Sequence, residues 1–295
     1  MRRFFSISAA TSREICSSAL FALLATSAAA IAILAPVLHC HQFGEAARMA
    51  REASFSAVLT GTLACAIFCT AISVRREISS GTAEMALSHA VSRPAFFLAK
   101  TLGGTCASLF MFLSLFPLSV TIVNGAAIGG AVAAEKGDVA TMWGPSLAAA
   151  VSVVIFPLAL AAILNRFFSV RFALAVARTM PVCAFASVAY RFDPSLVSRY
   201  LPAYVALAIP PVVFTAASAA AAMRLRGNLA FAAVLALFAA SLPAIGNYCL
   251  SNALSRGGTV SWGYAGLCAV AAVPPTVLFL VLGATAAGRI EGRED

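Results

Sequence analysis

The sequence predicts an all-α, polytopic membrane protein of about eight transmembrane helices with one helical cytoplasmic coupling segment. Of the 295 residues, 61% are hydrophobic and only 11% are charged, whereas charged residues make up about 25% of an average soluble domain. The apolar residues are gathered into windows of about 20 residues, which is the length of helix that crosses the hydrocarbon core of a bilayer. We therefore expect a single transmembrane domain over residues 1–295.

The apolar windows predict the individual spans. They cover residues 18–38, 54–74, 101–123, 143–164, 171–190, 203–223, 229–250 and 264–287. The fifth window is the weakest, because it contains Arg178, which is costly inside a bilayer, and Pro181, which interrupts helical backbone bonding. If this segment does not cross the bilayer, every later segment changes sides.

The basic residues predict the orientation of the chain. Most arginines and lysines fall in segments that lie on the same side as the N-terminus when eight spans are drawn, and such segments are cytoplasmic by the positive-inside rule. We therefore expect both termini in the cytoplasm and a multi-pass protein of the plasma (inner) membrane of a bacterium. The formal net charge is +9, but the basic residues form no stripe interleaved with aromatic residues, so the partner is the lipid bilayer and not a nucleic acid.

Residues 2–17 predict an interfacial helix before the first span. The segment contains three arginines (Arg2, Arg3 and Arg13), the aromatic pair Phe4 and Phe5, and Glu14. A positively charged, partly apolar helix of this kind lies along the surface of a membrane. A cleaved signal peptide is not favoured, because the region before the apolar core is too long and contains an acidic residue.

The distribution of ionisable residues argues against an ion-coupled carrier and against an intramembrane hydrolase. No Asp, Glu or His falls inside a predicted span, although ion-coupled carriers commonly use an acidic residue at depth and a nucleophilic serine needs a nearby base. The chain also lacks the G-x-x-x-x-G-K-[ST] loop that binds nucleotide phosphates. We expect no catalytic residues and no cofactor, and any energy for work must come from another polypeptide.

Two smaller features have a structural and a functional interpretation each. Arg178 is the one charge predicted inside a span, either as an interfacial arginine or as a gate or substrate contact. His39, Cys40 and His41 are ligand types that suit copper or zinc, but no fourth ligand is evident, so we predict no metal site there.

The most informative segment is the polar stretch 75–100 between the second and third spans. It begins with two arginines and contains Glu77 and Glu84 one heptad apart. Ile78, Met85 and His89 fall on one face of a helix. Pro94 suits the first turn of a following helix. This pattern predicts a cytoplasmic helix followed by a turn and a second helix that enters the bilayer.

The string REISSGTAEMALSHAVSRPAFFLAKTLGG resembles the signature of type-2 ABC transporter permeases, of the copper-maturation and gliding-motility kind. The flanking strings TSREICSSALFALL and GEAARMAREASFSAVLTGTLACAIF, and LPAIGNYCLSNALSRGGTVSWGYAG near the end of the chain, are also similar to that family. Residues that match the family pattern are Glu77, Gly81, Thr82, Val91, Ser92, Arg93 and Lys100. Many members have six spans, and they often place a proline before the Val-Ser-Arg turn, where this chain has His89 and Ala90.

The resemblance implies a permease subunit that couples ATP hydrolysis by a separate ATPase subunit to transport, with export favoured. It also implies a second permease subunit, identical or different, and a coupling helix that docks on the ATPase. The coupling residues would be Glu77, Gly81, Thr82, Glu84, Met85, Arg93, Pro94 and Lys100. An ATP-independent carrier or channel, or an integral membrane assembly or scaffold protein, remains an alternative.

Overall fold

The computed structural model describes residues 2–38, 46–80, 92–136, 151–190, 194–225, 227–248 and 260–288. Within these ranges the chain is helical apart from short turns and contains no strand, which confirms the predicted all-α class. In chain order the elements are α1 (Arg2–Cys16), α2 (Ala19–Leu38), α3 (Ala46–Ala64), the π-helix η1 (Cys65–Cys69), α4 (Thr70–Ser79), α6 (Arg93–Lys136), the π-helix η2 (Val151–Ile155), α8 (Phe156–Phe168), α9 (Phe172–Tyr190), α10 (Pro194–Arg224), α11 (Gly227–Tyr248) and α13 (Trp262–Ala287).

The described helices are compatible with a membrane protein that has four to five candidate spans. Among the described residues, the helices long and apolar enough to cross a bilayer are Glu52–Ser79, Arg93–Val123, Tyr200–Arg224 and Trp262–Ala287. The pair α1 and α2, which is bent by 58°, adds a fifth candidate if it is one broken span. The apolar helices Ser152–Phe168 and Phe172–Val188 are shorter. The predicted count of eight spans is therefore not confirmed.

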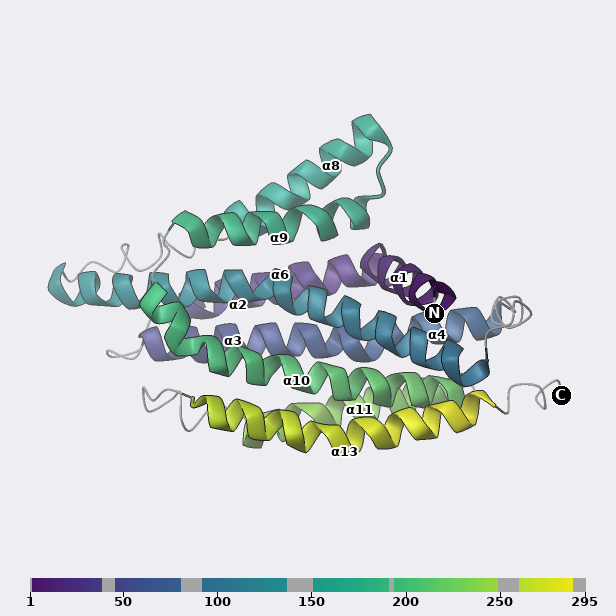
Figure 1. The fold of residues 1–295 in the computed structure, drawn as a ribbon. Helices are drawn as coiled ribbons and strands as arrows, with labels where there is room; N and C mark the ends of the chain where they lie inside the picture. The colour runs from purple at the N-terminus through teal and green to yellow at the C-terminus, as the bar shows by residue number, and fades with distance from the viewer. Residues whose placement is uncertain are drawn as a thin grey trace.

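Successive long helices run in opposite directions along one common axis (Figure 1). Helix α1, the end of α4, the start of α6, the junction of α10 and α11, and the end of α13 gather at one end of the bundle. We call this the basal end. Contacts between α1 and α6, α4 and α10, and α13 and α6 agree with this arrangement.

The centre of the bundle is formed by α3, η1 and α4 together with α6 and α10. In the apolar window of Glu52–Ser79, 83% of residues are buried inside the protein. Tyr204 on α10 contacts Phe55 and Phe116 edge-on, and its hydroxyl lies 2.8 Å from the hydroxyl of Ser119. Edge-to-face ring packing with a satisfied hydroxyl fixes the register of α3, α6 and α10 against one another.

The π-helix η1 is held by a hydrogen bond from another helix. The Ser218 hydroxyl on α10 donates to the Ala66 carbonyl at 3.1 Å, in a buried position. A π-helical turn is less regularly bonded than an α-helix, so an added donor helps to satisfy the backbone of η1. This contact ties the middle of the continuous helix formed by α3, η1 and α4 to α10.

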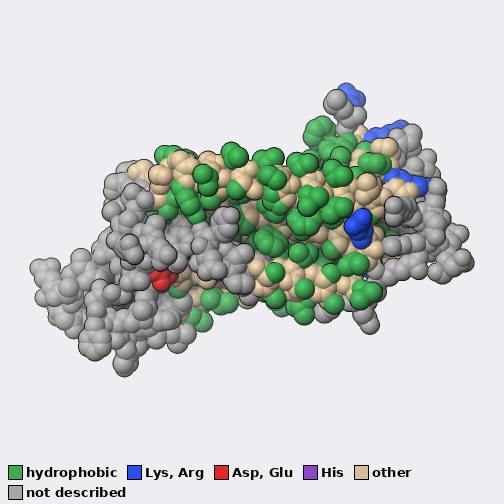
Figure 2. All heavy atoms as spheres, turned by 90° about the horizontal axis from the view of Figure 1, so that it is seen from below, with side chains coloured by type: hydrophobic (Ala, Val, Ile, Leu, Met, Phe, Trp, Pro, Cys, Tyr) green, Lys and Arg blue, Asp and Glu red, His purple; other side chains and the backbone are tan. Residues whose placement is uncertain are grey.

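Helix α13 lies at the edge of the bundle, because only 6% of its apolar window is buried. Leu267, Val270 and Val277 are more than half exposed. Figure 2 shows apolar side chains over the length of this face, with basic side chains gathered toward the basal end. A broad apolar surface flanked by basic residues suits contact with lipid.

Helices α8 and α9 form a hairpin on another side of the bundle (Figure 1). Ala161 of α8 and Ala175 and Val176 of α9 are buried in one cluster with Ala22 of α2. Small side chains allow helices to approach closely. The hairpin is therefore packed on the first turn of α2, close to the bend between α1 and α2.

Candidate functional site: a buried ion pair at the basal end

The best-defined polar site lies where α4 ends and α6 begins. Glu77 is in the last turn of α4, and Lys100 is on the third turn of α6. Residues 81–91 between the two helices lie outside the described residues. The site therefore joins the two ends of the polar segment that the sequence singled out.

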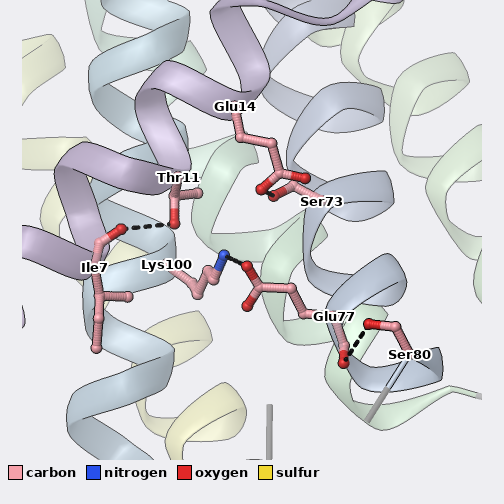
Figure 3. Close-up of polar contacts among 7 residues, drawn as sticks. All are labelled: Ile7, Thr11, Glu14, Ser73, Glu77, Ser80 and Lys100. Carbon is pink, nitrogen blue, oxygen red and sulfur yellow. Dashed lines mark hydrogen bonds and ion pairs between the residues drawn. The ribbon is translucent and has the colours of Figure 1, made fainter. Parts of the chain in front are cut away.

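Glu77 and Lys100 form an ion pair, with the Lys100 Nζ donating to the Glu77 Oε1 (Figure 3). The Lys100 side chain is 3% exposed and the Glu77 side chain is 25% exposed. The Lys100 Nζ also lies 5.9 Å from the centre of the Phe96 ring. A buried ammonium is unfavourable without a counter-charge, and the Glu77 carboxylate supplies that counter-charge to Lys100.

Helix α1 covers this ion pair from one side. Ser8 and Thr11 of α1 are buried, and they pack against Gly103, one turn along α6 from Lys100. A Cβ at Gly103 would lie 2.6 Å from the Ser8 carbonyl oxygen and 2.7 Å from the Thr11 Cβ. Only glycine permits so close a crossing of two helices. The Thr11 hydroxyl bonds the Ile7 carbonyl of its own helix at 2.9 Å.

Glu14 connects α1 to α4. The Ser73 hydroxyl donates to the Glu14 Oε2 at 3.3 Å, one turn before Glu77 on α4 (Figure 3). Hydrogen bonds to a charged group are stronger than those between neutral groups. Helix α1 thus contacts both helices that form the ion pair, α6 through Gly103 and α4 through Ser73.

Two arginines extend the site to the other helices of the basal end. The Arg75 Nη1 donates to the Leu225 carbonyl at 2.6 Å, just after the end of α10. The Arg93 Nη1 donates to the Gly288 carbonyl at 3.1 Å, just after the end of α13. Carbonyls at helix C-termini lack intrahelical partners and carry partial negative charge, so arginine is a suitable donor. These bonds join α4 to α10 and α6 to α13.

A buried hydroxyl lies deeper in the same region. Among the described residues, the Thr70 Oγ1 has no hydrogen-bond partner. It lies opposite Gly104, where an added Cβ would come within 2.6 Å of it. Leaving a hydroxyl unpaired in the interior costs about 1–3 kcal/mol of stability. The close crossing of α4 and α6 therefore carries the cost of a buried hydroxyl that has no partner among the described residues.

The sequence predicted residues of this site without predicting how they meet. Glu77 and Lys100 were predicted as contacts to an ATPase, and in the structure their charged groups face each other. Arg93 and Pro94 lie at the start of α6, with Pro94 exposed. Gly81, Thr82, Glu84, Met85 and Val91 lie outside the described residues, as do His39, Cys40 and His41. Arg178 is exposed on α9 and stays a predicted gate or substrate contact.

Sequence reasoning did not assign roles to several residues of the site. Glu14, Ser73 and Gly103 were not predicted to meet, because their contacts join helices that are distant in the sequence. One signal was available: Gly103 and Gly104 are adjacent glycines in an apolar helix, a pattern that often marks close helix packing. Within the described residues, no group of three or more His, Cys, Asp or Glu side chains is arranged to hold a metal ion.

No protein-family model, no curated protein and no solved structure matches this chain.

Proposed function

We propose that the chain is the transmembrane permease subunit of an ABC transporter, in which a separate ATPase subunit supplies the energy. The resemblance of segment 76–104 to type-2 permeases supports this proposal, and so do the four to five apolar helices long enough to cross a membrane. In this arrangement the basal end faces the cytoplasm, two permease subunits assemble in the plasma membrane, and transport is directed outward.

The observation that carries the proposal is the ion pair between Glu77 and Lys100. It holds together the two ends of segment 75–100, which is the segment proposed to dock on the ATPase. Because Lys100 is 3% exposed, it serves inside the permease rather than on the docking surface. A force applied to the segment would act on α4 and α6 together instead of parting them.

The contacts around the ion pair give a path for that force. Glu14 and Gly103 link the movement to α1, while Arg75 and Arg93 link it to the ends of α10 and α13. When two ATPase subunits bind ATP and close against each other, the basal ends of several helices would then tilt together as a unit. Rigid-body movement of packed helices is a common form of conformational coupling.

The test uses the tagged chain purified from its native membrane together with the ATPase subunit that accompanies it, reconstituted in liposomes. We expect vanadate-sensitive ATP hydrolysis in the complex. Glu77→Gln is expected to lower the hydrolysis rate about tenfold or more while the two subunits still copurify, because the loss of about 1.4 kcal/mol of coupling corresponds to a factor of ten. Ala162→Gln, at an exposed helical position of α8 outside segment 75–100, is the control.

Two outcomes would contradict the proposed function, and a third would contradict only the role of the ion pair. Absence of any ATPase from the purified complex, with no hydrolysis, favours an assembly or scaffold protein. Solute movement by the chain alone in ATP-free liposomes favours a carrier or channel. Full hydrolysis in Glu77→Gln would leave the ATPase association intact but remove the proposed role of the ion pair.

A further inference from the structure

The turn between α8 and α9 combines exposed aromatic residues with exposed arginines. Phe167 is 76% exposed, Phe168 is 71% exposed and Phe172 is 40% exposed. Arg166 and Arg171 flank the turn, and both are exposed. None of the described residues pairs with either guanidinium. Three exposed aromatic rings and two exposed arginines on one short turn form a distinct surface, which we call the hairpin tip.

The backbone of the hairpin tip is tightly turned. Ser169 has a φ of 54°, in the left-handed region, and it is the only non-glycine residue with positive φ among the described residues. The Val170 amide donates back to the Leu164 carbonyl at 3.4 Å. The Ser169 amide donates to the same carbonyl, which is the six-residue bond that closes many helix C-termini. It sets the aromatic and basic residues close together on a compact turn.

The depth of the hairpin tip follows from its packing. Val170 and Ala173 pack against the cluster that contains Ala22, in the first turn of α2. Helix α1, which precedes α2, is the basic helix predicted to lie along the membrane surface. The hairpin tip therefore lies at the level where the bundle passes from the surface of the membrane into its apolar interior.

Arg178 belongs to the same surface. It lies seven residues, about two helical turns, beyond Arg171 and is exposed on the same face, so at a rise of about 1.5 Å per residue it is about 10 Å deeper along the helix. An arginine side chain spans most of this distance and extends toward the headgroups when its helix faces lipid. Within the described part of the chain, no residue pairs with its guanidinium.

We propose that the hairpin tip is a binding site for anionic phospholipid in the cytoplasmic leaflet, with Phe167, Phe168 and Phe172 in the acyl layer and Arg166, Arg171 and Arg178 on the phosphate groups. Charge complementarity supports this occupant, because the surface has three cations and no described acidic residue on α8 or α9. Exposed phenylalanines suit an acyl layer, whereas an acidic protein surface would leave them without apolar partners. Anionic lipid attracts basic residues near the membrane surface.

The test places a fluorescent reporter at the tip. Phe167→Trp is made in a chain whose two natural tryptophans are replaced by phenylalanine, and the purified chain is reconstituted in mixed bilayers of phosphatidylglycerol and phosphatidylcholine. Either lipid carries bromine, which quenches tryptophan on contact. We expect brominated phosphatidylglycerol to quench about threefold more efficiently than brominated phosphatidylcholine at equal fraction, which reflects enrichment by the basic surface.

Replacing Arg166, Arg171 and Arg178 by glutamine is expected to equalise the two lipids while quenching itself remains. Arg76→Gln, an exposed arginine on α4 away from the hairpin tip, should leave the preference unchanged. Equal quenching by both lipids in the unaltered tip would overturn the anionic preference. Absence of quenching by either lipid would show that the tip faces water or protein, and would overturn the site altogether. The measurement needs no ATPase, so its outcome is separate from that of the proposed function.

Discussion

Glu77 and Lys100 differ in exposure, and this difference sets the relative cost of removing each of them. Glu77→Gln leaves the ammonium of Lys100, whose side chain is 3% exposed, without its counter-charge, whereas Lys100→Met leaves a carboxylate that is 25% exposed. An unpaired buried charge costs about 3–5 kcal/mol. A charged group that has access to water costs the protein about 1 kcal/mol or less of stability when its partner is removed.

We therefore expect Glu77→Gln to destabilise the protein by about 3 kcal/mol and Lys100→Met by about 1 kcal/mol. Unfolding of the purified protein in mixed detergent micelles, followed by circular dichroism, measures both values. The double variant should be close to Lys100→Met, because neither charge is then left buried. Equal costs for the two single variants would contradict the burial that the structure gives to Lys100.

Ser169 carries backbone strain that glycine would relieve. A residue with a side chain in the left-handed region costs roughly 1–2 kcal/mol, and Ser169 has a φ of 54°. Ser169→Gly is expected to raise the Tm by about 2 °C. Ala162→Gly, at an exposed helical position of α8, should lower it, since glycine costs about 1 kcal/mol inside a helix. A lower Tm for both variants would show that the Ser169 turn is not under strain.

At the scale of the elements, the sequence predicted most of what depends on local pattern. Apolar windows predicted the long helices, and the polar segment 75–100 was placed between the second and third of them. The pairing of Glu77 with Lys100 was not predictable in the same way, because it depends on the crossing of α4 and α6. Hydropathy also does not distinguish a full span from a shorter apolar helix such as Phe172–Val188, so apolar windows alone do not settle the number of spans.

The crossing of α1 over α6 depends on Gly103. A side chain there must displace Ser8 and Thr11, since an added Cβ lies 2.6 Å from the Ser8 carbonyl oxygen. We expect Gly103→Leu to lift α1 from the bundle at a cost of about 1–3 kcal/mol. Gly266→Leu on α13 is the matched control, because no atom lies within 4 Å of an added Cβ at that position.

The reactivity of Cys16, the last residue of α1, reports this displacement. Burial raises the pKa of the Cys16 thiol to about 11, so at pH 8 about one thiol in a thousand is the reactive thiolate. Alkylation of Cys16, followed by mass spectrometry, should be slow at pH 8 and accelerate as the pH rises toward 11. Gly103→Leu should bring the rate at pH 8 close to that of a free thiol, and Gly266→Leu should not. Unchanged protection in Gly103→Leu would contradict the packing of α1 on α6.

At the scale of the whole molecule, one end of the bundle collects the features proposed to act together. The ion pair, the crossing of α1, the arginine bonds to Leu225 and Gly288 and the hairpin tip all lie toward the basal end (Figure 1). The start of α13, where Ser261 caps the helix by accepting from the Tyr264 amide at 3.2 Å, lies at the opposite end. Both proposals therefore require that the basal end face the cytoplasm.

Single cysteines at the two ends test this orientation directly. In a chain without its natural cysteines, we expect Ser80→Cys, exposed after α4, to react with a membrane-impermeant maleimide only in inside-out vesicles. Ser261→Cys, exposed before α13, should react only in right-side-out vesicles. Both sites are close to helix ends and exposed, so their reactivity depends on the side of the membrane they face and not on local burial.

Reaction of Ser80→Cys from the outside would exclude an ATPase as the partner of segment 75–100, because ATP is cytoplasmic. The same result would place the hairpin tip in the outer leaflet, contrary to the lipid site proposed above. Reaction of both cysteines from one side would contradict the antiparallel passage of the helices on which the basal end is defined.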